Sequence, residues 1–303
     1  MHTYAHTITI VNHYHCLPDY HRQSSSCTFK QPTLKMPPRV LPAGFKLPLT
    51  PLCKHYDNLA SVPPSIQKYF HQRKSIFSFY DWDIRLTDTA WFGVTPEPVA
   101  NQIAKDLSPS FSSSSQLLPS QGREEGGTII DIFAGAGGNT IAFALSEKWT
   151  RIIAIERDAD TLACAQHNAE VYGVFEQITW VHGDSFEFLA MLKETPELLD
   201  PEVRVDVERT VVFASPPWGG VGYADHEVFD LERMEPYGLR ELHRACRPMG
   251  HVLFLPRTGD IRQVAELVPN GGDKIDVVQY CMRGASKAMV AYLPAEKEQQ
   301  SSI

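Results

Sequence analysis

Residues 131–140, DIFAGAGGNT, follow a short apolar run and place three glycines within four positions. Glycine allows the backbone to turn tightly and to approach a ligand closely. A helix that begins after such a turn presents free N–H groups to that ligand. The stretch therefore predicts a buried strand over 128–133, a ligand-binding turn, and a helix over 138–148.

The same alternation of strand and helix continues to the end of the chain. Short apolar runs predict strands over 128–133, 151–155, 178–182, 210–214, 251–255, 274–281 and 287–293. The stretches between them predict helices over 138–148, 158–172, 185–193, 234–247 and 260–268. This order favours right-handed crossovers and a mainly parallel, seven-stranded sheet with helices on both faces. The short connection 283–285 predicts an antiparallel hairpin at the sheet edge.

The rest of the chain divides into segments of different composition. Residues 1–62, which include a proline-rich stretch, are expected to be a disordered tail and linker. Aromatic and basic residues near helical spacing predict a small helical accessory segment over 63–107. Serine-rich residues 108–127 are expected to form a flexible loop. The main α/β domain then covers 128–295, and 296–303 are expected to be a tail.

Composition and charge set further bounds. The chain of 303 residues has 43% hydrophobic and 21% charged residues, which is typical of a soluble globular protein. Residues 1–120 contain 11 Lys/Arg and 7 Asp/Glu, a net charge of +4, whereas residues 121–303 contain 17 and 29, a net charge of −12. The basic share therefore lies in the N-terminal part.

Cysteine spacing and apolar runs indicate the environment of the protein. The six cysteines show no paired spacing, which favours a reducing compartment. We see no signal-peptide pattern and no apolar run of roughly 18 residues, so we expect no membrane segment. The histidines and cysteines between residues 2 and 27 match no zinc spacing, and we expect no metal site.

Acidic residues accompany the ends of three predicted strands. Asp131 precedes the glycine turn, Glu156 ends the second strand, and Asp184 follows the third. In open α/β sheets, ligands bind outside the carboxyl ends of the strands, where the strand order reverses. Glu156 could accept hydrogen bonds from both hydroxyls of a ribose, and Asp184 could reach an adenine amine. These positions predict a nucleoside-containing cofactor.

A nicotinamide enzyme would show similar features, so the details of the turn must separate the two classes. The third glycine of the dinucleotide fingerprint is missing. An acid before the turn suits a ligand with sulfonium and ammonium groups, such as S-adenosylmethionine. With the segment described next, this favours a Rossmann-like, class I S-adenosylmethionine-dependent methyltransferase over a dehydrogenase. The candidate cofactor residues are Thr95, Asp131, Phe133, Gly135, Gly137, Asn139, Thr140, Glu156 and Asp184.

The segment Ser215-Pro216-Pro217-Trp218 follows the predicted strand 210–214. The two prolines fix φ and remove two backbone donors, so the carbonyls of Ser215 and Pro216 should point outward without competing N–H groups. Such carbonyls suit an exocyclic amino group, and Trp218 offers a face for a flat ring. Prolines also commonly terminate strands. Beside the predicted cofactor, the segment favours methylation of a ring amine.

Five strings resemble those of trimethylguanosine synthases, the RNA cap guanine-N2 methyltransferase family. They are WFGVTPE (91–97), GGNT (137–140), NAEVYG (168–173), SPPWGG (215–220) and FLPR (254–257), within about residues 63–293. The resemblance implies methylation of N2 of the 7-methylguanosine cap of small nuclear and small nucleolar RNAs to the 2,2,7-trimethyl form. It also implies a nuclear or nucleolar location, ribonucleoprotein proteins as candidate partners, and a monomer.

The resemblance implies roles for the acceptor residues. Ser215, Pro216, Pro217 and Trp218 would form the catalytic segment, and Trp218 would stack on the base. A guanine methylated at N7 carries a positive charge, so this stacking gains a cation–π contribution of about 0.5–2 kcal/mol. Catalysis would come mainly from alignment of the amine with the methyl group. The proton would be lost late to Ser215, a backbone carbonyl or water.

Other positions are carried over from the resemblance or depart from it. Asn168 would contact the base, and Arg257 and Lys68 would hold the cap phosphates. Gly93 stands where other members often have Ser, which weakens a cap contact there, and Glu156 stands where many have Asp.

The sequence leaves alternatives open for the roles of two further tryptophans and for the function of the protein. Trp82 and Trp91 are equally compatible with lining the site and with a core or lid role. Rival functions are an N2-guanine methyltransferase for internal guanines of ribosomal or transfer RNA, and a cap-binding module without catalysis. A glutamine methyltransferase is less favoured.

Overall fold

The computed structural model describes residues 3–10, 37–107, 127–218, 227–267 and 275–295. The predicted serine-rich loop, apart from its last residue, and the predicted tail at 296–303 lie outside these residues. No helix among the described residues is long and apolar enough to cross a membrane.

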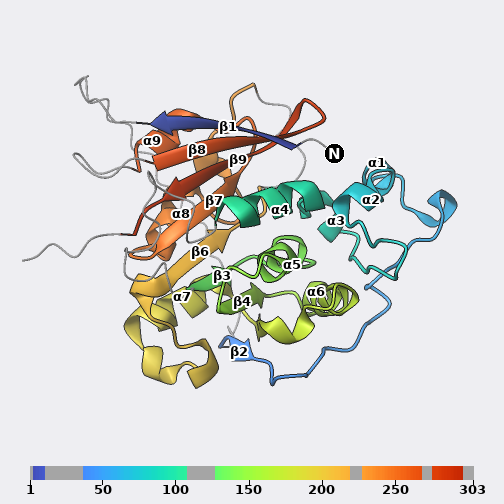
Figure 1. Ribbon diagram of the computed structural model, residues 1–303, viewed down its shortest axis with the longest axis horizontal. Helices are drawn as coiled ribbons and strands as arrows, with labels where there is room; N and C mark the ends of the chain where they lie inside the picture. Colours follow the sequence, from blue (N-terminus) through green and yellow to red (C-terminus); the bar gives the residue numbers. More distant parts are fainter. Residues whose placement is uncertain (1–2, 11–36, 108–126, 219–226, 268–274, 296–303) are drawn as a thin grey trace, which may run out of the picture.

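A nine-stranded mixed sheet forms the centre of the molecule (Figure 1). The strand order is β1-β8-β9-β7-β6-β3-β4-β5-β2. The five central strands β7, β6, β3, β4 and β5 are parallel, and the outer strands pair antiparallel. The strands are β1 (Thr3–Ile10), β2 (Arg39–Val40), β3 (Thr128–Asp131), β4 (Arg151–Glu156), β5 (Ile178–His182), β6 (Thr210–Ala214), β7 (Gly250–Leu255), β8 (Ile275–Met282) and β9 (Ala285–Leu293). The predicted Rossmann-like α/β fold is confirmed.

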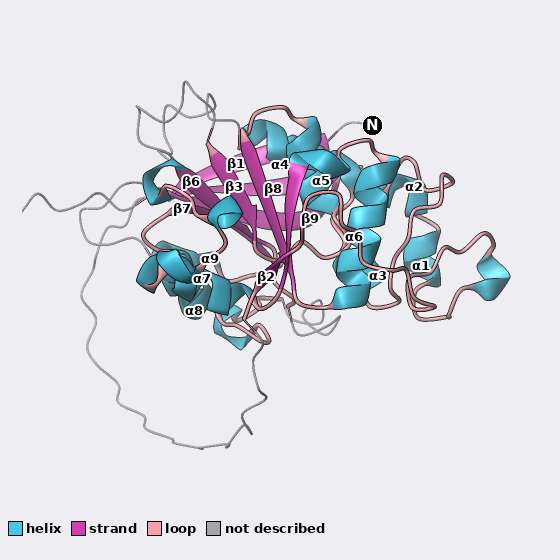
Figure 2. Cartoon of the chain, turned by 90° about the horizontal axis from the view of Figure 1, so that it is seen from below, coloured by secondary structure: helices cyan, strands magenta, loops and turns pink. Residues whose placement is uncertain are grey.

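Helices cover both faces of the sheet, with α4, α5 and α6 on one side and α7, α8 and α9 on the other (Figure 2). The α-helices are α1 (Gln67–Phe70), α2 (Arg73–Ile76), α3 (Ala90–Gly93), α4 (Glu97–Asp106), α5 (Gly138–Leu145), α6 (Ala159–Val171), α7 (Ser185–Glu194), α8 (Leu239–Cys246) and α9 (Ile261–Ala265). Short 3-10 helices are η1 (Leu59–Ser61), η3 (Phe175–Gln177), η4 (Pro196–Leu198), η5 (Pro201–Val203), η6 (Val207–Arg209) and η8 (Leu231–Arg233).

Successive residues of the central strands supply two separate cores. Side chains alternate between the two faces of a strand. In β3, Ile129 packs into the core that includes α4, α5 and α6, whereas Ile130 packs into the core that includes α7 and α8. Val211 and Val212 of β6 divide in the same way. This explains why the central strands appear in the sequence as continuous apolar runs.

The sheet extends beyond the seven predicted strands at both edges. β1 pairs antiparallel with β8, and β2 pairs antiparallel with β5. The β8–β9 hairpin is antiparallel as predicted, but it is not at the edge, because β1 continues the sheet beyond β8. The prediction of a tail and linker over 1–62 is wrong for β1 and β2. β1 is rich in β-branched residues, but no local feature indicates which strand edge it joins.

The proline-rich stretch after β2 lies along helix α6. The Leu47 N–H donates to Gln166 Oε1 at 2.8 Å, and Thr50 Oγ1 donates to Asp160 Oδ1 at 2.6 Å. Cys53 Sγ lies 3.3 Å from the Asp160 carbonyl oxygen. Proline-rich composition alone therefore misled us, because partners more than 100 residues away hold this segment in place.

The accessory segment 63–107 contains α1 to α4 and shares the core of the main domain. Ile66, Phe70, Tyr80 and Trp91 are buried in the same cluster as α5. Trp91 is only 1% exposed, which assigns it to the core rather than to a ligand-lining position.

Candidate active site

The site lies where the strand order reverses. From β3 the chain continues to β4 and β5 on one side, and from β6 it continues to β7 on the other. β3 is hydrogen-bonded to both groups, with Asp131 paired in register with Ala154 of β4 and with Phe213 of β6. The carboxyl ends of β3, β4 and β6 therefore meet, and this is where ligands bind in open α/β sheets.

The glycine turn after β3 requires its glycines. Gly135 has φ of +54° and Gly137 has φ of +92°, a region that other residues rarely adopt. A Cβ atom on Gly137 would lie 3.3 Å from the Ala165 Cα of α6, so a side chain there would also push the helix away. These two positions confirm the predicted tight turn.

Asp131 braces this turn from the inside. Thr140 Oγ1 donates to Asp131 Oδ2 at 2.6 Å, and the Phe133 N–H donates to Asp131 Oδ1 at 3.3 Å. The side chain is fully buried, and this burial raises the pKa of Asp131 to about 7. Asp131 therefore joins strand, turn and helix, rather than presenting its carboxylate on the surface of the turn.

Glu156 closes the turn from the neighbouring strand. The Gly135 N–H donates to Glu156 Oε2 at 3.0 Å, and the Asp158 N–H donates to Glu156 Oε1 at 2.9 Å. Burial raises the pKa of Glu156. A carboxylate has about four acceptor positions, so each oxygen keeps capacity for a ligand hydroxyl.

Thr95 and Asn139 form a polar pair beside the turn. Asn139 Nδ2 donates to Thr95 Oγ1 at 3.0 Å, and both side chains are buried. Asn139 Oδ1 is also buried and has no hydrogen-bond partner among the described residues. Buried polar atoms are nearly always paired, so an unpaired acceptor beside a ligand-binding turn indicates a group supplied by a ligand.

Asp184 has a structural role that the sequence did not reveal. It caps α7, accepting from the N–H groups of Phe186 at 3.0 Å and Glu187 at 3.1 Å. The Tyr237 hydroxyl donates to Asp184 Oδ2 at 3.3 Å, and the Tyr237 ring stacks on Phe186 with centroids 3.8 Å apart. Tyr237 also lies 6.1 Å from the Phe133 ring. We missed Tyr237, because no sequence pattern connects it to a residue 53 positions earlier.

Residues 215–218, called the acceptor segment because they are predicted to hold the methyl acceptor, follow β6, the parallel neighbour of β3. Ser215 and Trp218 are half-buried, Pro216 is buried, and Pro217 is exposed. Trp218 Nε1 donates to the Phe254 carbonyl oxygen at 3.3 Å, and the two rings are nearly parallel with centroids 5.7 Å apart. The indole is thus held against β7, at the same edge of the sheet as the glycine turn.

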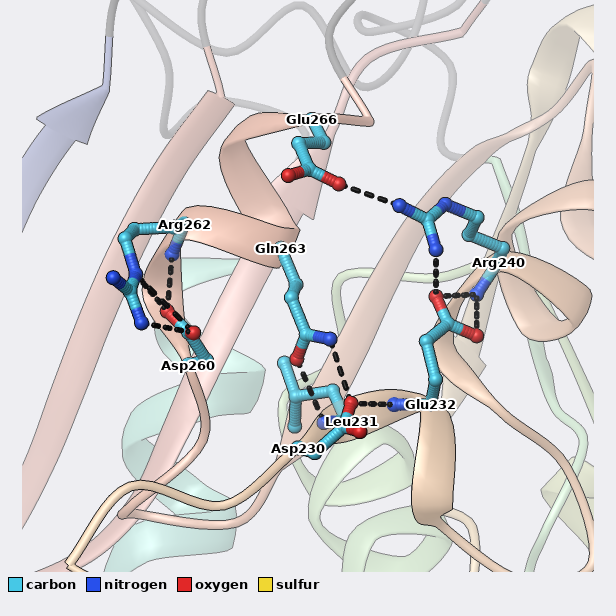
Figure 3. Close-up of polar contacts among 8 residues, drawn as sticks. All are labelled: Asp230, Leu231, Glu232, Arg240, Asp260, Arg262, Gln263 and Glu266. Carbon is cyan, nitrogen blue, oxygen red and sulfur yellow. Dashed lines mark hydrogen bonds and ion pairs between the residues drawn. The ribbon is translucent and has the colours of Figure 1, made fainter. Parts of the chain in front are cut away.

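The chain that follows the acceptor segment is anchored on α8 and α9 (Figure 3). Gln263 Nε2 of α9 donates to Asp230 Oδ1 at 2.6 Å. Arg240 of α8 pairs with Glu232 at 3.1 Å and with Glu266 at 2.5 Å. These contacts fix where the chain leaves the site, beyond residues 219–226, which lie outside the described part.

The two predicted phosphate-binding residues are both exposed and lie on different elements. Arg257 follows β7, three residues after Phe254. Lys68 lies on α1 with its Nζ 4.8 Å from the Tyr69 ring. Tyr69 contacts Phe92 of α3 edge-on, with centroids 5.5 Å apart. α3 leads directly to Thr95, so this contact connects α1 with the cofactor side of the site.

Asn168 does not fit the predicted contact with the base. Its side chain is fully buried. Its Oδ1 accepts from the Arg85 N–H at 2.8 Å, and its Nδ2 donates to the carbonyl oxygens of Arg85 at 2.9 Å and Ala136 at 3.0 Å. These bonds engage both ends of the amide. Asn168 instead connects the accessory segment to the glycine turn.

Comparison with known proteins agrees with this geometry. The model of the RNA cap guanine-N2 methyltransferase family matches residues 126–296, more than half of the chain. A trimethylguanosine synthase of Schizosaccharomyces pombe is 33% identical over 234 residues, which cover 76% of this chain and 87% of that protein. The chain belongs to the RNA cap guanine-N2 methyltransferase family. A second trimethylguanosine synthase, from Saccharomyces cerevisiae, is 29% identical over 202 residues, which cover 65% of this chain and 56% of that protein.

Solved structures support the fold of this family member. A putative methyltransferase from Porphyromonas gingivalis W83 matches with a TM-score of 0.50 at 13% identity, covering 78% of this chain and 52% of that one. The predicted S-adenosylmethionine-dependent methyltransferase class is therefore confirmed.

The residues at the turn fit the methyl donor. S-adenosylmethionine supplies a methyl group on a positively charged sulfonium. Asn139 offers an unpaired buried acceptor, and Glu156 keeps capacity for hydroxyls. At Gly135 an added Cβ would have only the Phe133 carbonyl oxygen within reach, at 4.0 Å, so the backbone there is open to close approach. Among the described residues, no cluster of His, Cys, Asp and Glu could hold a metal ion.

Proposed function

We propose that this protein methylates N2 of the guanine in a 7-methylguanosine RNA cap and produces the 2,2,7-trimethylguanosine form. One observation carries the proposal. The segment Ser215–Trp218 continues β6, which pairs in register with the strand that ends in the glycine turn. This puts residues 215–218 and the glycine turn after the ends of adjacent parallel strands, in a chain that is 33% identical to a trimethylguanosine synthase.

In this proposal, the acceptor segment holds and orients the base. Trp218, fixed by its bond to the Phe254 carbonyl, stacks on the charged purine. The carbonyls of Ser215 and Pro216 accept hydrogen bonds from the N2 amine. Arg257 and Lys68 hold the cap phosphates, for which the planar guanidinium of arginine is well suited.

The chemistry depends mainly on alignment. The lone pair of guanine N2 is delocalised into the ring, so the amine is a poor nucleophile. The acceptor segment contains no strongly basic side chain. Holding the amine in line with the methyl group removes much of the entropic barrier. The proton leaves late, to the Ser215 hydroxyl, a backbone carbonyl or water.

The biological substrates follow from the same proposal. Small nuclear and small nucleolar RNAs carry the cap that this reaction would modify. The protein would then act in the nucleus, with the nucleolus included, and would meet proteins of the corresponding ribonucleoprotein particles.

Mass spectrometry of a 7-methylguanosine dinucleotide cap, incubated with the protein and S-adenosylmethionine, tests the proposal. We expect a mass gain of one or two methyl groups on this cap and none on the unmethylated cap. Methylation of internal guanines, without competition by 7-methylguanosine triphosphate, would identify a different acceptor. Failure to bind S-adenosylmethionine in calorimetry, together with no mass gain on the cap, would favour a cap-binding module without catalysis instead.

A further inference from the structure

Three aromatic rings stack on one another outside the site described above. Trp82 lies over Phe79 with ring centroids 5.2 Å apart and an interplanar angle of 17°. Phe79 in turn lies over Tyr172 of α6, at 4.8 Å and 22°. The outer rings are open to solvent, since Trp82 is 69% and Phe79 40% exposed. We call these three residues the aromatic ladder.

The inner end of the aromatic ladder is held rigidly. The Tyr172 hydroxyl donates to Glu97 Oε2 at 2.6 Å, and its oxygen accepts from the Phe79 N–H at 3.4 Å. The Ser78 N–H also donates to Glu97 Oε2, at 2.6 Å. Burial raises the pKa of Tyr172, so its hydroxyl stays protonated and keeps donating. The outer rings are therefore presented on a preorganised support rather than on a free loop.

Glu97, which holds Tyr172, is also connected to the glycine turn. Glu97 begins α4, two residues after Thr95, whose hydroxyl accepts from Asn139 of the turn. Asp83, which follows Trp82 in the chain, has its Oδ2 3.3 Å from His167 Nε2 of α6. The aromatic ladder consequently keeps a fixed position relative to the site.

The distribution of charge favours binding of a polyanion near the aromatic ladder over binding to the acidic residues 121–303. Residues 121–303 carry 17 Lys/Arg and 29 Asp/Glu, a net charge of −12, which repels a phosphate chain. Residues 73–85, which carry the outer rings, contain Arg73, Lys74 and Arg85 against Asp81 and Asp83, a net charge of +1. The exposed Lys74 pairs with Asp81 at 2.5 Å, and the half-buried Arg73 guanidinium lies 4.4 Å from the centroid of the Phe70 ring. Aromatic faces beside cations are the usual platform for single-stranded nucleic acid.

We propose that the aromatic ladder stacks an unpaired base of the RNA chain that extends from the cap. The proposal rests on the proposed function only for the identity of the RNA. The flat outer face of one indole matches a single base, whereas a stable protein interface buries about 800 Å² on each partner. Since every base has a π-face, the contact tolerates any sequence and adds affinity for a chain longer than the cap.

Trp82→Ala tests the proposal through the dependence on RNA length. We expect unchanged kcat/KM on the 7-methylguanosine dinucleotide cap and a KM about tenfold higher on a capped, unpaired oligonucleotide. Trp82→Phe should restore most of the affinity for the oligonucleotide. Leu198→Ala is the matched control, because Leu198 is also 69% exposed but lies in η4, and it should change neither substrate.

Fluorescence anisotropy with uncapped, labelled RNA gives a readout that does not need activity. Trp82→Ala should weaken binding of unpaired RNA about tenfold and leave binding of an abasic chain of equal length unchanged. Equal loss on the dinucleotide cap and the oligonucleotide would overturn the proposal, as a structural effect. Unchanged RNA binding would also overturn it and would leave Trp82 as a protein contact. If the wild type binds uncapped RNA through Trp82 but does not methylate the cap, the proposed function fails and this inference stands.

Discussion

The glycine turn after β3 and residues 37–107, called the N-terminal wrap, are held in place by different kinds of contact. The turn is held largely by local contacts, since Asp131 accepts from Thr140 and from the Phe133 N–H within one strand–turn–helix unit, and Glu156 of the next strand accepts from the Gly135 N–H. The wrap is held by single side chains of α6 far along the chain, such as Gln166 and Asn168. The glycine turn thus depends mainly on residues 131–156, whereas the wrap is attached by hydrogen bonds between residues more than 80 positions apart.

The largest effect is expected at the acceptor segment. Trp218→Ala should lower kcat/KM for the cap by about three orders of magnitude, because stacking, the cation–π contribution and alignment are lost together. Affinity for S-adenosylmethionine, measured by calorimetry, should stay within about twofold. If affinity for the methyl donor falls equally, the two halves of the site are not separable. If Ser215→Ala leaves turnover intact, the proposed role of the serine is dropped.

The stability of the protein should depend on pH through the buried carboxyl group of Asp131. The pKa of Asp131 is raised from 3.8 to about 7 by burial, so between these values the folded state keeps a proton that the unfolded state loses. Its contribution to stability is therefore highest below about pH 4 and falls by up to about 4 kcal/mol towards pH 7. The wild-type free energy of unfolding, minus that of Asp131→Asn, should decrease over this range in urea titrations. A difference that does not vary with pH would contradict the assignment.

The next largest effect is expected at Asn168, which connects the N-terminal wrap to the glycine turn. Asn168→Ala leaves the backbone groups of Arg85 and the carbonyl of Ala136 without partners, which should cost about 3 kcal/mol of unfolding free energy. Affinity for S-adenosylmethionine should fall as well, because Ala136 belongs to the turn. Asn101→Ala, at an exposed position of α4, is the control and should change stability by less than about 0.5 kcal/mol. Equal effects of both variants in chemical denaturation would show that the hydrogen bonds of Asn168 do not contribute to the free energy of unfolding.

The smallest effect is expected at the surface of the wrap. Lys46→Ala removes an exposed ion pair with Glu170 at 2.6 Å, which should cost less than about 1 kcal/mol and still less at high salt. Thermal unfolding at two salt concentrations measures this. A cost as large as that of Asn168→Ala would mean that surface charge, rather than buried amides, attaches the wrap.

Sequence reasoning located the seven strands β3 to β9, the glycine turn and the acidic residues at the strand ends, because each depends on short-range features. The acids and glycines lie within a few residues of a strand end, and parallel strands bring those ends together. It failed where a residue type serves two purposes. The amide of Asn168 could bind a base or brace a backbone, and only its complete burial with three hydrogen bonds decides between them.

By itself, the sequence determined the strand–turn–helix order, the glycine positions with positive φ, and the acceptor segment after β6. These are consequences of side-chain periodicity and backbone sterics, which act over a few residues. Only the tertiary structure decided that β1 extends the sheet, that Tyr237 binds Asp184, and that Trp82, Phe79 and Tyr172 stack. Such contacts depend on which distant segments meet once the chain is folded, and no local pattern encodes those partners.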